Sequence, residues 1–150
     1  MNILIANDHG GVKLKNEIKN HLESRGHHIT NLGIDTEDSV DYPDLAVKAG
    51  TEFKKNKYDF GILICGTGIG ISISANKIRG IRCALLINKF SAEMAKAHNN
   101  ANFIAFGGRI NYNDSPSEMV DAFIASKFEG GRHEKRVNKI MDIENSTPCC

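Results

Sequence analysis

One stretch of the chain decides how the rest is interpreted: Phe60-Gly61-Ile62-Leu63-Ile64-Cys65-Gly66-Thr67-Gly68-Ile69-Gly70-Ile71-Ser72. It begins as an unbroken apolar run, which is the pattern of a strand that is buried on both faces. The run ends in a thiol, a hydroxyl and three glycines, and glycine lets a backbone turn sharply and approach a ligand closely. Residues 71–77 can continue as a helix. A strand, a glycine-rich turn and a helix N-terminus together predict an anion site, because backbone N–H groups converge there.

The composition is that of an ordinary globular protein. The chain has 150 residues, of which 41% are hydrophobic and 25% charged, and its formal net charge is +1. We therefore expect one domain over residues 1–150, with a polar tail from about residue 144 to 150, and no binding to nucleic acid or membrane. The first residues lack the charged start and long apolar region of a signal peptide, so we expect a cytoplasmic protein.

Apolar and amphipathic segments alternate along the chain. Strands are predicted over residues 2–6, 28–32, 60–65, 81–87 and 102–106. Helices are predicted between them, and Ser91 is expected to cap one of these helices. The alternation predicts a Rossmann-like three-layer α/β/α sandwich with a five-stranded parallel sheet. Right-handed crossovers would then place Asp8-His9, the turn after Cys65 and the loop near Arg109 at one edge of the sheet.

The glycine-rich turn has several interpretations. Its Gly66-x-Gly68-x-Gly70 pattern resembles a dinucleotide-binding loop, but the last spacing is short and no acidic residue stands about twenty positions further on. It also lacks the Gly-Lys-Ser/Thr ending of a Walker A loop. A tight turn without a ligand is a further alternative. The remaining interpretation is a site for a small anion or a developing oxyanion, with Cys65 as base or nucleophile and Thr67 as a hydroxyl donor, because a thiol beside a helix N-terminus loses its proton readily.

Other candidate side chains have structural explanations beside functional ones. Asp8-His9 can act in acid–base chemistry or can cap a helix. His98 lies late in an amphipathic helix, where a histidine is usually structural, although the polar run that it opens favours a function. Arg132 and Arg136 stand one helical turn apart and can either clamp a phosphate or form a solvated face. No spacing predicts a catalytic metal, and the terminal pair Cys149-Cys150 has no partner ligands nearby.

With these residues assembled, the chain resembles the ribose-5-phosphate isomerase type B family, which also holds galactose-6-phosphate isomerase subunits. The resemblance covers nearly the whole chain, and its motifs are specific in their order and spacing. The motifs are Asp8-His9-Gly10-Gly11, Asp41-Tyr42-Pro43, Ile64-Cys65-Gly66-Thr67-Gly68-Ile69-Gly70-Ile71-Ser72, Ala75-Asn76-Lys77, Arg79-Gly80-Ile81-Arg82, His98-Asn99 with Asn102, Phe106-Gly107-Gly108-Arg109, Glu129-Gly130-Gly131-Arg132-His133 and Arg136-Val137.

The resemblance implies interconversion of ribose 5-phosphate and ribulose 5-phosphate through a cis-enediolate, without metal or cofactor, in the pentose phosphate pathway. It implies that Cys65 is the base between C1 and C2, and that Thr67 assists proton transfer between O1 and O2. His98, assisted by Asp8, would open the furanose ring. The backbone donors to the enediolate oxygen would be those of Gly66, Gly68, Ile69 and Gly70.

The resemblance also implies how substrate and subunits are held. The phosphate would be bound by His9, Arg132 and Arg136. The pocket would be lined by Tyr42, Asn99 and Arg109. The active site is expected between two subunits of a homodimer, which can pair further into a tetramer. The residues that would face the Cys65 loop of the other subunit are His98, Asn99, Arg132 and Arg136.

Two features depart from the family pattern. Asn100 stands where the family often has Asp, which keeps the hydrogen bonding but removes a charge, and the tail over residues 146–150 has no counterpart. Some relatives carry a carboxylate base elsewhere on the turn. Here Cys65 is present and Ile71 occupies a nearby position, so we predict the cysteine type of site.

Two alternatives to a ribose-5-phosphate isomerase stay open. One is an isomerase of a six-carbon sugar phosphate, allose 6-phosphate or galactose 6-phosphate, because the sequence does not reveal the depth of the pocket. The other is a non-catalytic sugar-phosphate or nucleotide-binding module that uses the same sheet edge.

Overall fold

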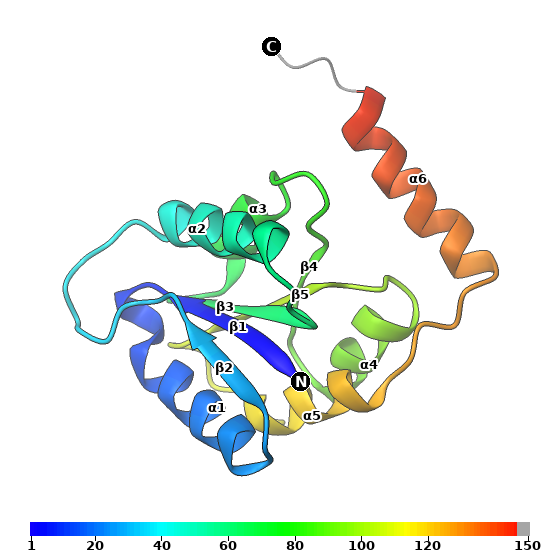
Figure 1. The fold of residues 1–150 in the computed structure, drawn as a ribbon. Helices are drawn as coiled ribbons and strands as arrows, with labels where there is room; N and C mark the ends of the chain where they lie inside the picture. Colours follow the sequence, from blue (N-terminus) through cyan, green and yellow to red (C-terminus); the bar gives the residue numbers. More distant parts are fainter. Residues whose placement is uncertain (147–150) are drawn as a thin grey trace.

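The fold is a parallel sheet between two layers of helices (Figure 1). The computed structural model describes residues 1–146 and orders the five strands β2-β1-β3-β5-β4, with each neighbouring pair parallel. The predicted α/β class is therefore confirmed. The strands are β1 (Asn2–Asn7), β2 (His28–Asn31), β3 (Phe60–Cys65), β4 (Cys83–Leu85) and β5 (Phe103–Gly107). The helices are η1 (His9–Gly11, a 3-10 helix), α1 (Val12–Ser24), α2 (Tyr42–Lys55), α3 (Ile69–Ala75), α4 (Lys89–Ala97), α5 (Pro116–Ala125) and α6 (Arg132–Ser146).

Successive residues of the central strand β3 point into two hydrophobic cores. Ile62 and Ile64 pack on one face with residues of α1, α4 and α5. Leu63 and Cys65 pack on the opposite face with residues of α2 and α3. Because helices cover both faces, β3 is buried over its whole length, as its unbroken apolar run predicts. The carboxyl end of β3 thus brings Cys65 to the edge of the sheet on the side of α2 and α3.

Strand β4 and helix α4 have other boundaries than the sequence predicted. The strand is shorter than the predicted segment 81–87, and the side chain of Asn76 accepts the N–H of Cys83 at 2.8 Å and donates to its carbonyl at 2.8 Å. Helix α4 is capped by Asn88, so the prediction of Ser91 as its cap is wrong. Asn88 Oδ1 accepts the N–H of Ser91 at 2.8 Å, and Ser91 Oγ accepts the N–H of Asn88 at 3.1 Å. This reciprocal capping box moves the start of the helix toward the N-terminus.

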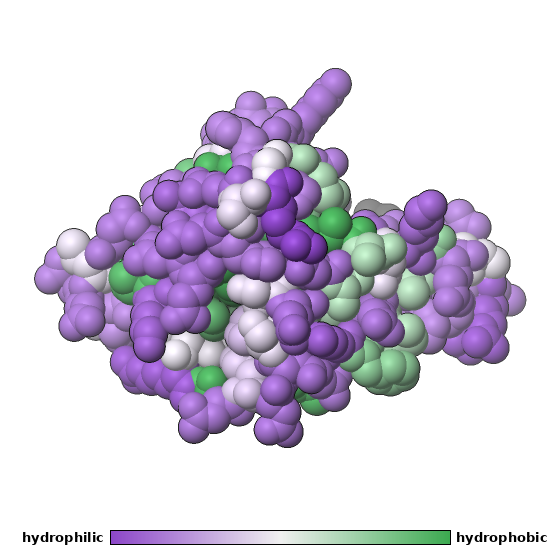
Figure 2. All heavy atoms as spheres, turned by 90° about the horizontal axis from the view of Figure 1, so that it is seen from below, coloured by the Kyte–Doolittle hydropathy of each residue, from purple (hydrophilic) through white to green (hydrophobic). Residues whose placement is uncertain are grey.

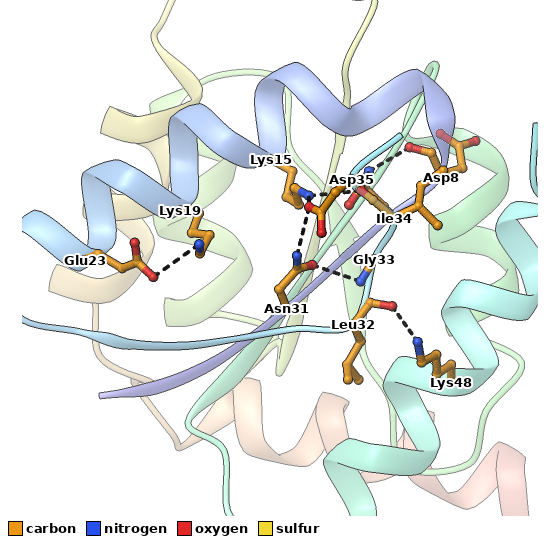
Figure 3. A network of polar contacts seen from close by, with 11 residues as sticks. Asp8, Lys15, Lys19, Glu23, Asn31, Leu32, Gly33, Ile34, Asp35 and Lys48 are labelled. Carbon is orange, nitrogen blue, oxygen red and sulfur yellow. Dashed lines mark hydrogen bonds and ion pairs between the residues drawn. The ribbon is translucent and has the colours of Figure 1, made fainter. Parts of the chain in front are cut away.

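A buried lysine fastens the loop that follows β2 (Figure 3). Lys15 on α1 is fully buried at 0% exposure, its Nζ donates to the carbonyl of Ile34 at 3.0 Å, and it forms an ion pair with Asp35. The hydrogen bond from Lys15, and then its charge, hold the pKa of Asp35 below its ordinary value. Asn7 also donates to the carbonyl of Ile34, at 3.2 Å. The loop is therefore tied to the carboxyl end of β1.

Helix α6 projects from the α/β body beside the edge strand β4 (Figure 1). Its Glu144 carboxylate accepts the N–H of Gly80 at 2.9 and 3.0 Å, and the carbonyl of Glu144 accepts a hydrogen bond from Arg79 at 2.8 Å. A groove of about 440 Å³ lies between α6 and β4, and its lining includes Ile140 and Ile143. These two side chains are 43% and 63% exposed. The last helix therefore carries an exposed apolar stripe.

The surface over α1, α4 and α5 is mostly hydrophilic, with hydrophobic residues in small areas between polar ones (Figure 2). Within residues 1–146, the longest and most apolar helices still fall short of what a membrane crossing requires. Cys149 and Cys150 lie outside the residues that the structure describes.

Candidate active site

Cys65 ends β3 and faces a turn whose backbone points at its sulfur. The thiol is 4% exposed, and its Sγ accepts the N–H of Gly68 at 3.1 Å. The turn requires glycine at that position, because Gly68 has a φ of +76° and an added Cβ would lie 2.7 Å from the carbonyl carbon of Phe106. The N–H of Ile69 donates to Thr67 Oγ1 at 3.3 Å. A backbone donor aimed at sulfur stabilises negative charge there, which is what a thiolate base needs.

The turn after β1 lies directly beside the Cys65 turn. Asp8 is 5% exposed and caps η1, because its Oδ1 accepts the N–H of Gly10 at 2.8 Å. A Cβ added to Gly10 would lie 2.9 Å from the Cα of Gly66, so the two backbones are in contact. His9 Nδ1 accepts the N–H of Val40 at 3.4 Å, from the loop that Lys15 and Asn7 anchor. The capping explanation of Asp8 is therefore confirmed, and its turn lies against the Cys65 turn, while the acid–base role stays a prediction.

Two further predicted residues, Tyr42 and Arg109, contact glycines of the Cys65 turn. A Cβ added to Gly70 would lie 2.5 Å from Cζ of Tyr42, so the aromatic ring rests on the start of α3. Arg109 lies against Gly66, at 3.6 Å from the position of an added Cβ, and its N–H donates to the carbonyl of Gly66 at 3.0 Å. One edge of the sheet therefore brings together the predicted residues Asp8, His9, Tyr42, Cys65, Gly66, Thr67, Gly68, Ile69, Gly70 and Arg109.

The other predicted residues form a second cluster, at the end of α4 and the start of α6. His98 stacks on His133, with ring centroids 4.0 Å apart and an angle of 10° between the rings. Glu129 Oε2 lies 3.7 Å from Nε2 of His98 and 3.4 Å from Nε2 of His133. Arg132 Nε donates to His133 Nε2 at 3.2 Å. The side chains of Arg132 and Arg136 line the same small hollow on α6.

The surroundings of His133 lower its pKa. Burial lowers the pKa of His133, and the nearby charges of His98 and Arg132 lower it further. A neutral imidazole keeps a lone pair, so its Nε2 can accept the Arg132 Nε–H. His133 thereby fixes the guanidinium of Arg132, although sequence reasoning gave it no role.

The two clusters lie at opposite ends of the same strands. Cys65 pairs with Gly107 at the carboxyl end of β5, whereas His98 and Asn99 come just before the amino end of that strand. The two ends of β5 are about 13 Å apart at the rise of a β-strand. In one chain the thiol and His98 therefore lie at opposite ends of the sheet.

The structural roles of three residues near the second cluster, Glu129, His133 and Asn100, were not predicted from the sequence. Glu129 and His133 belong to the quoted motif, but nothing in their spacing showed that they contact His98. Asn100 has a φ of +43°, and its carbonyl accepts hydrogen bonds from Arg82 at 2.7 and 3.1 Å. Asn is one of the few residues that adopt this left-handed backbone readily, which gives Asn100 a structural reason beside the loss of charge.

Known proteins match this chain over nearly its whole length. A sequence model of the family described as Ribose/Galactose Isomerase matches residues 3–140. Ribose-5-phosphate isomerase B of Escherichia coli is 42% identical over 137 residues, covering 91% of this chain and 92% of that protein. A structure of Clostridium thermocellum ribose-5-phosphate isomerase B superposes with a TM-score of 0.92 and 46% identity, covering 97% of this chain and 98% of that one.

A structure of ribose-5-phosphate isomerase B from Mycoplasma genitalium with bound ribulose 5-phosphate also matches. It has a TM-score of 0.90 and 40% identity, and the match covers 97% of each chain. Identity at this level over whole chains, together with the same fold, confirms the resemblance found in the motifs. The chain is an enzyme of the ribose/galactose isomerase family.

Proposed function

We propose that this protein interconverts ribose 5-phosphate and ribulose 5-phosphate by proton transfer through a cis-enediolate. The observation that carries the proposal is the Cys65 thiol, which receives a backbone N–H from Gly68 at the carboxyl edge of the sheet. Relatives at 40% to 46% identity are named ribose-5-phosphate isomerase B, and one of them was solved with ribulose 5-phosphate. The proposal also includes a cytoplasmic location and a role in the pentose phosphate pathway.

Cys65 is the proposed base. Its thiolate removes the proton from C2 of the open-chain aldose, the electron pair forms the C1–C2 double bond, and O1 becomes an oxyanion. Thr67 helps a proton move from O2 to O1, and the thiol then returns its proton to C1. Such a base contributes about 10²–10⁴-fold to the rate. Gly68 and Ile69 already donate their N–H groups within the turn, so Gly66 and Gly70 are the favoured donors to the oxyanion.

The remaining residues are proposed to prepare and hold the substrate. His98, with Asp8, opens the furanose ring before the proton transfer. Arg132 and Arg136 bind the phosphate together with His9, since arginine presents paired donors to phosphate oxygens. The residues proposed to line the pocket are Tyr42, Asn99 and Arg109.

The two-cluster geometry supports a homodimer that shares its active sites. Cys65 and His98 lie at opposite ends of the sheet in one chain, so a second copy is needed to bring the two side chains together. The exposed apolar stripe on α6, with Ile140 and Ile143, offers a surface for that copy. A C2 dimer would complete two equivalent sites from the two clusters of each chain.

Turnover of ribose 5-phosphate by the purified protein tests the proposal, with EDTA present and allose 6-phosphate as the comparison. We expect fast conversion of the pentose in chelator and slower conversion of the hexose. Preference for allose 6-phosphate would favour the six-carbon alternative. A folded protein that converts neither sugar would favour the binding-module alternative.

Replacing Arg136 by alanine is expected to raise the KM for ribose 5-phosphate by roughly tenfold or more, with a smaller change in kcat. The reason is that a charge-assisted hydrogen bond to phosphate contributes about 1.5–3 kcal/mol to binding. Initial-rate kinetics over a range of substrate concentrations measure both parameters. Lys139→Ala is the matched control, because Lys139 lines the same hollow but has no proposed role. An unchanged KM in the Arg136 variant would remove Arg136 from the phosphate site.

A further inference from the structure

Glu129 joins the two stacked histidines of the second cluster. Its Oε2 lies 3.7 Å from Nε2 of His98 and 3.4 Å from Nε2 of His133, and its N–H donates to the carbonyl of Ala97 at 3.0 Å. The last contact ties Glu129 to the residue immediately before His98. Gly130 and Gly131 follow with φ of +66° and +55°, and this turn brings the first residues of α6 back against the end of α4.

The Glu129 carboxylate is close enough to His98 to influence its imidazole, and is more than a solvated surface charge. His98 stands between His133, which stacks on its ring, and Glu129, which faces its Nε2. The Glu129 carboxylate lies within 4 Å of both imidazoles, and Arg132 and Arg136 stand nearby on α6. A separation of 3.7 Å is long for a hydrogen bond, but catalytic hydrogen bonds are often long before substrate binds.

The same three side chains have ligand atoms within 4.8 Å of one another, which is a distance compatible with one metal ion. The geometry does not favour a metal. An imidazole binds a metal ion in the plane of its ring, and two rings 4.0 Å apart at 10° do not have planes that meet at a shared ion. Arg132 also occupies the lone pair of His133 with its Nε–H. The cluster is therefore better explained by acid–base chemistry.

We infer that Glu129 is a positioning residue for ring opening: it orients His98 and stabilises the imidazolium that His98 becomes when it takes a proton from the sugar. This inference rests on the proposed function. In the step, the C1 hydroxyl loses its proton to His98, the bond between C1 and the ring oxygen breaks, and that oxygen then receives the proton from His98. The products are an aldehyde at C1 and a hydroxyl at C4, with no net gain or loss of protons.

Ring opening and proton transfer can be measured separately. Ribulose 5-phosphate is an open chain, because its C5 oxygen carries the phosphate and cannot close a five-membered ring. Exchange of its C1 hydrogen with deuterium from solvent needs the Cys65 step but no ring opening. Conversion of ribose 5-phosphate needs both steps. A side chain that acts only through His98 should therefore slow the second reaction and spare the first.

The test is the Glu129→Gln variant of the full-length protein, with both reactions followed by NMR in D₂O. We expect kcat/KM for ribose 5-phosphate to fall by about tenfold, which corresponds to about 1.4 kcal/mol, and deuterium exchange into ribulose 5-phosphate to stay within about twofold of the parent protein. Glu129→Asp should recover part of the loss. Glu134→Gln, which removes a charge from the first turn of α6 shortly after Glu129, should leave both rates unchanged.

Three results would count against the inference. An equal fall in both reactions would indicate a structural role for Glu129, and unchanged kinetics would indicate no role. A fall of the same size in Glu134→Gln would indicate a general effect of charge. Failure of the proposed function is distinguishable, because in that case the parent protein itself would show neither conversion nor exchange.

Discussion

Replacement of Cys65 by alanine is expected to lower the turnover of ribose 5-phosphate by about 10³-fold or more, because it removes the base that moves the proton between C1 and C2. No other side chain of the Cys65 turn is placed to replace the thiol, since Thr67 offers only a hydroxyl and the turn's other positions between 65 and 70 are glycines and Ile69. The fold should persist, because Cys65 contributes one small side chain to a core formed by α2, α3 and the sheet.

The measurement combines kcat with a binding assay for ribulose 5-phosphate, so that loss of chemistry is separated from loss of affinity. Cys83→Ala is the matched control. Cys83 is the other cysteine within residues 1–146, and it lies on edge strand β4 away from the glycine-rich turn. We expect Cys65→Ala to bind and not turn over, and Cys83→Ala to do both. Near-normal turnover in Cys65→Ala would remove the proposed base from the mechanism.

The centre of the fold was predictable because its signals are local. The apolar run before Cys65 requires burial on both faces, and the structure covers both faces with helices. Gly68 and Gly70 are explained by contacts that any side chain would disturb. Gly68 needs a positive φ, while Gly66 and Gly70 lie under Arg109 and Tyr42. Strand, turn and helix follow one another along the chain, so the sequence alone is enough to place this part of the site.

Other features depend on residues far apart in the chain, and their sequence signal was weak. Lysine is a residue type usually found on the solvated face of a helix. Lys15 is buried instead, because the loop after β2 supplies a carbonyl and the carboxylate of Asp35 as partners for its Nζ. Ser91 was predicted as the cap of α4, but the reciprocal hydrogen bonds of the structure make Asn88 the N-cap and place Ser91 inside the helix. Glu129 reaches His98 only because two glycines turn the chain back toward α4.

The division of the site into two clusters was expected from the family resemblance alone. The structure supplies a physical reason for it. Parallel strands bring Asp8, Cys65 and Arg109 to one edge, whereas α4 delivers His98 to the opposite end of β5. Periodicity and spacing in the sequence predict neither of these two placements, because the order of the strands is a property of the whole sheet.

Complementation between two inactive variants tests most directly the claim that two chains build one active site. Cys65→Ala and His98→Asn are expected to be nearly inactive alone. In a C2 dimer that shares its sites, a mixed dimer has one site with both defects and one with neither. Random pairing of equal amounts makes half of the dimers mixed, so co-expression should restore about one quarter of the parent activity.

The control pairs two variants of the same cluster, His98→Asn and Arg136→Ala. Every shared site in that mixture keeps one defect, so activity at ribose 5-phosphate concentrations below KM should stay at the mean of the two separate variants. We expect recovery in the Cys65 and His98 mixture and none in the control. If the first mixture stays inactive although tagged subunits show that mixed dimers form, the thiol and His98 do not meet across a subunit interface and the central claim is contradicted.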